Sequence, residues 1–156
     1  MKNLNIEEIS KFIARQSPET KIYIGADSER VTIDGINYAD YTLAIVVHID
    51  GNKGCKVFGS IERERDYDQR KDRPAMRLMT EVYKVAELFQ KLEEVLGDRE
   101  IQIHLDLNES ELHGSSCVVQ QAVGYIKGVC GVNPLVKPDA FAASFAADRM
   151  KHILGR

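Results

Sequence analysis

The sequence has few cysteines and no long apolar run. Its three cysteines are scattered, and no CxxC occurs, so the sequence suggests neither a disulfide framework nor a cysteine zinc site. A membrane span needs about 20 apolar residues in succession, and the N-terminal "MKNLNIEEIS" lacks the apolar segment of a signal peptide. We therefore expect a protein of the reducing cytoplasm that has no membrane partner.

An excess of positive charge is also missing. The formal net charge is -3, so the surface as a whole is not expected to attract nucleic acid, and such binding would need a local patch or metal ions. There is no GxxxxGK[ST] motif, which argues against a P-loop ATPase. The Gly-rich phosphate loops of an actin-like ATPase are absent as well.

The length and composition fit one globular domain over residues 1–156. The chain has 156 residues, of which 44% are hydrophobic and 29% charged. Residues 1–18 form an N-terminal helix extension in this prediction, because apolar residues recur at helical spacing in residues 4–16 and Pro18 follows. No internal repeat or linker divides the rest.

Apolar periodicity predicts a mixed α/β fold. Strands are predicted at residues 21–28, 36–50, 55–63, 100–108 and 133–139. Helices are predicted at 74–96, at about 116–129 and at 140–154. The first three strands are joined by short turns and should form an antiparallel meander, and crossover helices should make the later strands parallel. The expected fold class is therefore a mixed five-stranded sheet flanked by helices.

Residues 62–73, "ERERDYDQRKDR", form a mixed-charge stretch with five acids and five bases. A solvated loop is one interpretation of such a stretch, and a flap over a substrate is the other. The sequence leaves both open.

Four acids lie at positions where the predicted fold would bury a carboxylate, which is costly without a partner or a cation. Asp27 ends the first predicted strand and Asp106 comes near the end of the fourth, so parallel neighbours would bring both to the carboxyl edge of the sheet. Glu81 falls inside the apolar stripe of its helix. Asp148 lies in the alanine-rich last helix. We expect all four to converge.

Each acid also has an ordinary interpretation, such as a turn, a snorkelling side chain or a local ion pair. Four converging carboxylates, however, repel one another unless a hard cation neutralises them. Oxygen ligands favour Mg²⁺ or Mn²⁺ over zinc. Two such ions about 4 Å apart clamp the attacking and leaving oxygens in phosphodiester cleavage.

The order of elements, with acids in "IGADSE", "MTEVYKV", "HLDLN" and "AADRM", resembles the ribonuclease H-like superfamily. Within it, the stretches "YIGADSE", "IHLDLN", "VGYIKGVCG" and "VKPDAFAASFAADRMKH" are similar to the YkuK-type group. The resemblance covers nearly the whole chain from residue 20 onward. It implies a ribonuclease H-like fold and a metal-dependent nuclease that acts on nucleic acid with two Mg²⁺ or Mn²⁺ ions.

The resemblance also implies roles for particular residues. By position, the catalytic and metal-binding acids are Asp27, Glu81, Asp106 and Asp148, with Glu87 as a substitute for the helix acid. Candidates for contacting phosphate or supporting the ligands are Ser28, Asn108, Lys137, Lys151 and His152. A structural or solvating role is an equal alternative for Lys137, Lys151 and His152, and turn formation is the preferred interpretation of Ser28 and Asn108.

Three functions remain possible at this point. The first is the metal-dependent nuclease. The second is a non-catalytic nucleic-acid-binding or regulatory module on the same fold, since fold does not fix function. The third is a structure-selective nuclease such as a junction resolvase, which would need a homodimer.

Overall fold

The computed structural model describes residues 4–68, 75–108 and 118–137. Its elements in chain order are α1 (Ile6–Ala14), β1 (Lys21–Ile33), β2 (Ile36–His48), the short 3-10 helix η1 (Ile49–Gly51), β3 (Cys55–Arg65), α2 (Ala75–Leu96), β4 (Glu100–Asn108), α3 (Val119–Cys130) and β5 (Leu135–Lys137). The helix predicted at 140–154 lies outside the described residues.

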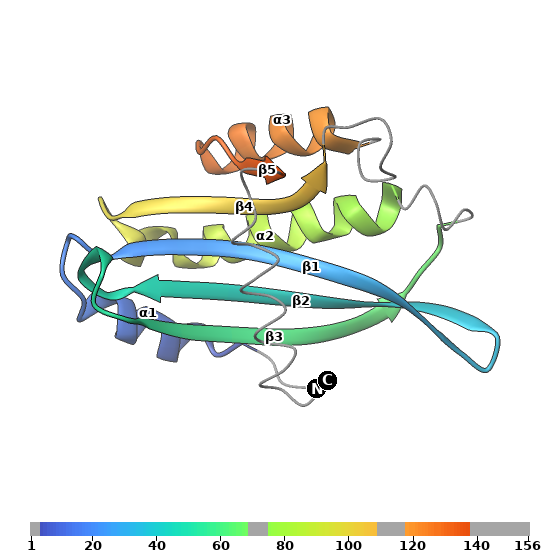
Figure 1. Ribbon diagram of the computed structural model, residues 1–156, viewed down its shortest axis with the longest axis horizontal. Coiled ribbons are helices and arrows are strands. Elements are labelled where there is room, and N and C mark those ends of the chain that lie inside the picture. Colours follow the sequence, from blue (N-terminus) through green and yellow to red (C-terminus); the bar gives the residue numbers. More distant parts are fainter. Residues whose placement is uncertain (1–3, 69–74, 109–117, 138–156) are drawn as a thin grey trace.

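The strands form one five-stranded sheet in the order β3-β2-β1-β4-β5 (Figure 1). β1, β2 and β3 pair antiparallel, while β4 runs parallel to β1 and β5 parallel to β4. The predicted mixed sheet, an antiparallel meander followed by parallel strands, is therefore confirmed.

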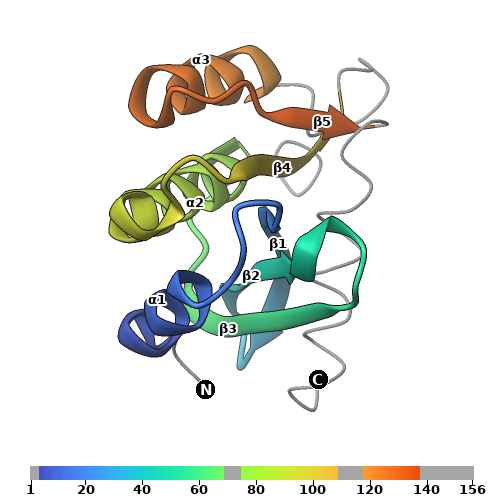
Figure 2. The same cartoon turned by 90° about the vertical axis from the view of Figure 1, so that its left-hand side faces the viewer.

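The three described α-helices cover one face of the sheet (Figure 2). Alternate residues of the strands, among them Ile24, Ile45 and Ile103, are fully buried on that face. They pack in one core cluster with the stripe of α2, which includes Val82 and Leu92. Each such side chain contributes about 1.5–3 kcal/mol by leaving water. The periodicity that predicted α2 thus reflects its burial against the sheet. Every helix in the described part of the chain is too short or too polar to cross a bilayer.

The first strand is longer than predicted. β1 runs past Asp27 to Ile33, and residues 27–33 pair with β2 through a tight turn. Asp34 and Gly35 in that turn have φ values of 52° and 78°, as a two-residue hairpin with the right twist requires. The expectation that the strand stops at residue 28 was wrong, because hairpin pairing continues after the parallel pairing with β4 has ended at Ala26. The resulting hairpin projects from the sheet in Figure 1.

Residues 62–68 are not a solvated loop throughout, because a strand and a buried acid lie within them. Residues 62–65 belong to β3, which lies at one edge of the described sheet. Asp66 is buried, and the Nε of Arg30 donates to its Oδ2 at 2.7 Å. Asp68 accepts from the backbone N–H groups of Met76 and Arg77, both at 2.9 Å, and so caps the start of α2. Residues 69–73 of the mixed-charge stretch lie outside the described residues.

The Arg30–Asp66 pair joins β1 to the segment before α2. The side chains of the two residues are only 16% and 1% exposed. Burial alone would raise the pKa of Asp66, but hydrogen bonds from Arg30 and from the Asp68 backbone amide lower that pKa below its ordinary value. The pair therefore stabilises the fold above the ordinary pKa of an aspartate, and this contribution is lost as the pH falls.

We predict that Arg30→Met lowers the free energy of unfolding by about 3 kcal/mol at pH 7, the lower end for breaking a buried pair. The difference from wild type should shrink in acid, because Asp66 becomes protonated there. Urea unfolding at pH 7 and pH 3 measures both effects. Lys11→Met is the control, since Lys11 pairs with Glu7 while their side chains are 68% and 78% exposed. Equal losses in the two variants would contradict the prediction.

Candidate active site

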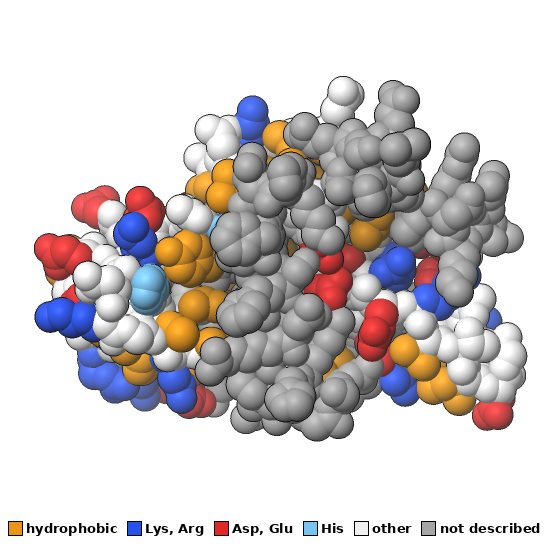
Figure 3. Space-filling view, viewed as in Figure 1, with side chains coloured by type: hydrophobic (Ala, Val, Ile, Leu, Met, Phe, Trp, Pro, Cys, Tyr) orange, Lys and Arg blue, Asp and Glu red, His pale blue; other side chains and the backbone are white. Residues whose placement is uncertain are grey.

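Asp27 and Asp106 lie on neighbouring parallel strands. The parallel pairing of β1 and β4 runs from Lys21 opposite Glu100 to Ala26 opposite Leu105, and the two acids are the next residues on each strand. Strand alternation places both on the face of the sheet turned away from the helices. On that face acidic side chains gather near the middle, over β1, with Lys and Arg side chains beside them (Figure 3). Both acids are half-buried.

Glu81 approaches the same region from α2. Its side chain is buried, with 4% of the residue exposed, as its place in the apolar stripe predicted. The hydroxyl of Ser28 donates a hydrogen bond to Oε2 of Glu81. Burial raises the pKa of Glu81 well above its ordinary value, and the nearby carboxylates of Asp27 and Asp106 raise that pKa further. The three acids therefore lie close enough to influence one another's charge.

Arg77 completes this arrangement from one helical turn before Glu81. Its Nη1 donates to the backbone carbonyl of Ser28 at 2.9 Å and to the hydroxyl of Ser28 at 2.7 Å. The positive charge of Arg77 counteracts part of the rise in the pKa of Glu81. Sequence analysis missed this residue. The available signal was its spacing of four residues from Glu81, which puts both on one face of α2.

The donor chemistry of the three acids fits a hard cation. Carboxylate oxygens are the ligands that Mg²⁺ and Mn²⁺ prefer, and a divalent ion would offset the repulsion that raises the pKa of Glu81. Within residues 4–68, 75–108 and 118–137, however, no group of three or more His, Cys, Asp or Glu is arranged to hold a metal ion. In this structure the carboxyl of Glu81 is directed to Ser28.

The remaining predicted residues fall into two groups. Asn108 and Lys137 pair across β4 and β5, at the carboxyl end of both strands and two residues beyond Asp106. Asp148, Lys151 and His152 lie outside the described residues. The roles assigned to all of these stay predictions.

Glu87, the substitute considered for the helix acid, lies away from the other carboxylates. It is exposed and forms an ion pair with Lys91 at 2.9 Å. The Lys91 ammonium lowers the pKa of Glu87. Of the two helix acids, Glu81 is therefore the one within electrostatic reach of Asp27 and Asp106.

His104 lies on the same strand face as Asp106, two residues earlier. Its ring contacts Tyr23 edge-to-face, with centroids 5.6 Å apart, and its Nε2 lies 2.9 Å from the side-chain oxygen of Gln102. Burial lowers the pKa of His104, which favours the neutral ring. Together with Tyr23, it forms a packed layer beside the acids.

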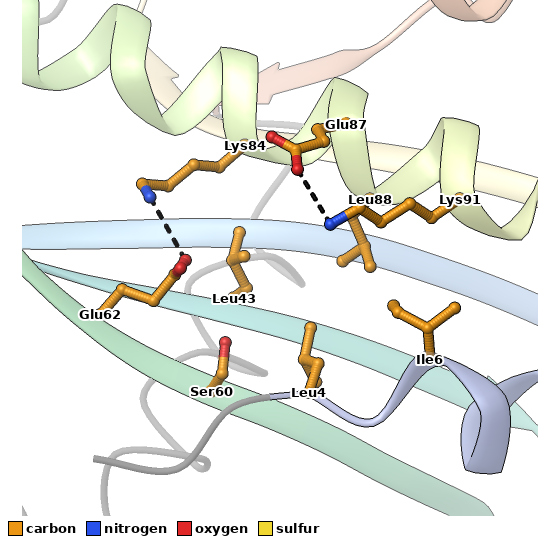
Figure 4. A pocket seen from close by; sticks show the side chains of 9 residues that line it. All are labelled: Leu4, Ile6, Leu43, Ser60, Glu62, Lys84, Glu87, Leu88 and Lys91. Atoms are coloured by element: carbon orange, nitrogen blue, oxygen red, sulfur yellow. Dashed lines mark hydrogen bonds and ion pairs between the residues drawn. The ribbon is translucent and has the colours of Figure 1, made fainter.

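A separate pocket of about 250 Å³ lies between α2, the start of α1 and strands β2 and β3 (Figure 4). Its floor is apolar, and the charges at its rim are paired with one another. Lys84 forms ion pairs with Glu62, at 3.3 Å, and with Glu64. Burial opposes the charge of Lys84, but these carboxylates raise its pKa. The pocket contains none of the candidate acids Asp27, Glu81 and Asp106, so we do not assign it to the same site.

Comparison with known proteins identifies the family. A family model described as "Ribonuclease H-like" matches residues 5–152, which is nearly the whole chain. No curated protein and no solved structure matches the chain. A family of this kind is consistent with a nuclease-type or nucleic-acid-related function. The observed strand order, the pair of acids on β1 and β4 and the family match agree, and the chain belongs to the ribonuclease H-like family.

Proposed function

We propose that this protein is a nuclease that hydrolyses phosphodiester bonds with the help of Mg²⁺ or Mn²⁺. The observation that supports the proposal best is the adjacent placement of Asp27 and Asp106, within electrostatic reach of Glu81. Asp27 and Asp106 follow directly on paired residues of adjacent parallel strands, and Glu81 reaches their electrostatic field from α2. A buried acid beside two others costs stability, so a ligand that neutralises them is the simplest explanation of the arrangement.

The residues would share the work as follows. Asp27 and Asp106 would hold ions at the edge where the two strands lie side by side, and Glu81 would complete the set from the helix. Asp148 is the fourth ligand by resemblance to the family. When bound, the ions would supply the positive charge that activates water and stabilises the reacting phosphate. Ser28 would orient Glu81, to which it already donates a hydrogen bond.

The test is a panel of labelled substrates with Mg²⁺, Mn²⁺ or EDTA. The panel contains an RNA–DNA hybrid, single-stranded RNA and DNA, duplex DNA and a four-way junction. We expect cleavage of at least one substrate with either ion and none with EDTA, because carboxylates alone cannot offset the charge that develops on phosphate. Cleavage that persists in EDTA would contradict the metal requirement. Preferential cutting of the junction by a dimer would favour a structure-selective nuclease.

A second candidate function is a non-catalytic nucleic-acid-binding module on the same fold. Two observations favour it. The carboxyl of Glu81 is hydrogen-bonded to Ser28, and the described residues contain no group of three or more His, Cys, Asp or Glu arranged to hold a metal ion. Calorimetry with Mn²⁺ separates the two candidates. Binding that competes with Mg²⁺ supports the nuclease, whereas nucleic-acid binding without any Mn²⁺ binding or cleavage supports the module.

A further inference from the structure

Arg77, Ser28 and Glu81 form a hydrogen-bonded chain that ends on a candidate metal-binding carboxyl. Nη1 of Arg77 donates to Oγ of Ser28 at 2.7 Å and to the backbone carbonyl of Ser28 at 2.9 Å. The hydroxyl of Ser28 in turn donates to Oε2 of Glu81. Two donor contacts to one residue fix both the backbone and the side chain of Ser28 relative to α2.

When Glu81 is ionised, the hydrogen bonds from Arg77 to Ser28 to Glu81 can run in only one direction. A guanidinium group carries donors and no acceptor, and a hydroxyl group carries a single proton. Because Nη1 donates to the hydroxyl oxygen of Ser28, the proton of that hydroxyl remains available for Glu81. The ionised carboxyl of Glu81 therefore accepts from Ser28, and its Oε2 is held at a defined place beside β1.

Arg77 is itself fixed by a second set of contacts. Its backbone N–H donates to Oδ2 of Asp68 at 2.9 Å, in the first turn of α2. The backbone N–H of Asp68 donates to Oδ1 of Asp66 at 3.0 Å, and Arg30 donates to both Asp66 and the carbonyl of Asp68, each at 2.7 Å. The start of α2 is thus anchored to β1, and the guanidinium of Arg77 extends from that anchored turn to Ser28.

Charge complements this geometry. Arg77 lies close enough to Glu81 and to Asp66 for its positive charge to favour the ionised form of both. It therefore offsets part of the repulsion that Asp27 and Asp106 exert on Glu81. A neutral side chain of similar length would remove the hydrogen bonds and the charge together.

We propose that Arg77 is a positioning residue: it orients the Ser28 hydroxyl and, through it, sets the place of the Glu81 carboxyl for metal binding. The effect on metal affinity rests on the proposed function. The effect on the position of Glu81 does not, because it follows from contacts within the protein alone.

Four variants test the proposal: Arg77→Met, Arg77→Lys, Ser28→Ala and the double variant Arg77→Met/Ser28→Ala. Removing a residue that orients a metal ligand weakens metal binding by about 10- to 100-fold. We expect this weakening of Mn²⁺ binding, measured by calorimetry, for Arg77→Met and for Ser28→Ala. Arg77→Lys should recover part of the affinity, because it keeps the charge but lacks the planar fork. The double variant should bind no more weakly than the weaker single variant, since both act through one chain of contacts.

The matched control is Lys91→Met, which removes a cation from the same helix where it pairs with the exposed Glu87. It should leave Mn²⁺ affinity unchanged. Circular dichroism and thermal unfolding show that each variant is folded. Wild-type Mn²⁺ affinity in a folded Arg77→Met variant would overturn the proposal. A double variant whose loss of Mn²⁺ affinity equals the product of the two single losses would overturn it as well.

A structural readout keeps this test separate from the proposed function. In metal-free crystals of Arg77→Met, the carboxyl of Glu81 should leave Ser28 and adopt other rotamers, whereas it should stay in place in the wild type. If Glu81 keeps its contact in the variant, Arg77 has no positioning role, whether or not the protein binds metal. A wild-type protein that binds no Mn²⁺ would instead contradict the proposed function and leave the crystal comparison to decide the role of Arg77.

Discussion

Asp106→Asn should abolish cleavage of every substrate in the panel while the protein stays folded. The change is isosteric on a half-buried side chain, but an amide is a poorer ligand and cannot neutralise a divalent ion. Loss of a residue that merely supports a metal ligand lowers metal affinity or activity by about 10- to 100-fold. Loss of a ligand itself should therefore lower the cleavage rate by more than about 100-fold. Initial cleavage rates and Mn²⁺ calorimetry measure the two parts of this effect.

Asp98→Asn is the matched control for Asp106→Asn. It is the same chemical change at an exposed residue just before β4. We expect wild-type cleavage and metal binding from it. If Asp106→Asn cuts as fast as Asp98→Asn, then Asp106 has no place in the chemistry and the proposed site is wrong.

Glu81→Gln should make the protein more stable and inactive. The amide removes the cost of a buried charge and its repulsion with Asp27 and Asp106, and its oxygen can still accept from Ser28. Substitutions that relieve such conflicts commonly add about 0.5–2 kcal/mol. For a domain of this size each kcal/mol raises Tm by about 2–4 °C. Cleavage should fall by more than about 100-fold, as for a lost metal ligand.

The gain in stability should depend on pH. The pKa of Glu81 is raised by folding above its ordinary value of 4.5. The wild type therefore has its full stability from this group below that ordinary value and loses it as the pH rises through the raised pKa. Glu81→Gln lacks this loss, so its advantage should be larger at pH 8 than at pH 5. Urea unfolding of both proteins at the two pH values measures the difference.

Glu87→Gln separates this effect from a general benefit of removing an acid from α2. Glu87 is exposed and paired with Lys91, so its replacement should change stability by no more than about 0.5 kcal/mol. A gain from Glu87→Gln as large as that from Glu81→Gln would show that burial among acids is not the cause.

The parts of the site that sequence analysis could predict were those that depend on local periodicity. Glu81 falls inside an apolar stripe, and helical geometry then requires it to face the sheet, as observed. Asp106 alternates with buried residues of β4, so its face was predictable too. The parallel pairing of β1 and β4 followed from the order of elements.

The parts that could not be predicted depend on partners far apart in sequence. Arg77 contacts Ser28 across 49 residues, and Arg30 contacts Asp66 across 36. Composition alone favoured a loop or a flap at residues 62–73, because mixed charges typically lie in solvent. The structure instead uses Asp66 and Asp68 to anchor α2. Nothing in the local pattern distinguishes a carboxylate that caps a distant helix from one that is solvated.

The order of charges on β3 limits how two copies of this protein can assemble. Glu62, Arg63, Glu64 and Arg65 alternate in sign along a strand at one edge of the described sheet. Two such edges could join antiparallel about a two-fold axis normal to the sheet. Residues opposite each other in the two strands would then point their side chains to the same face of the joined sheet. Glu62 would then face Glu64 when the axis passes through Arg63, and Arg63 would face Arg65 when it passes through Glu64. Like charges opposite each other are destabilising, so this end of β3 resists edge-to-edge aggregation.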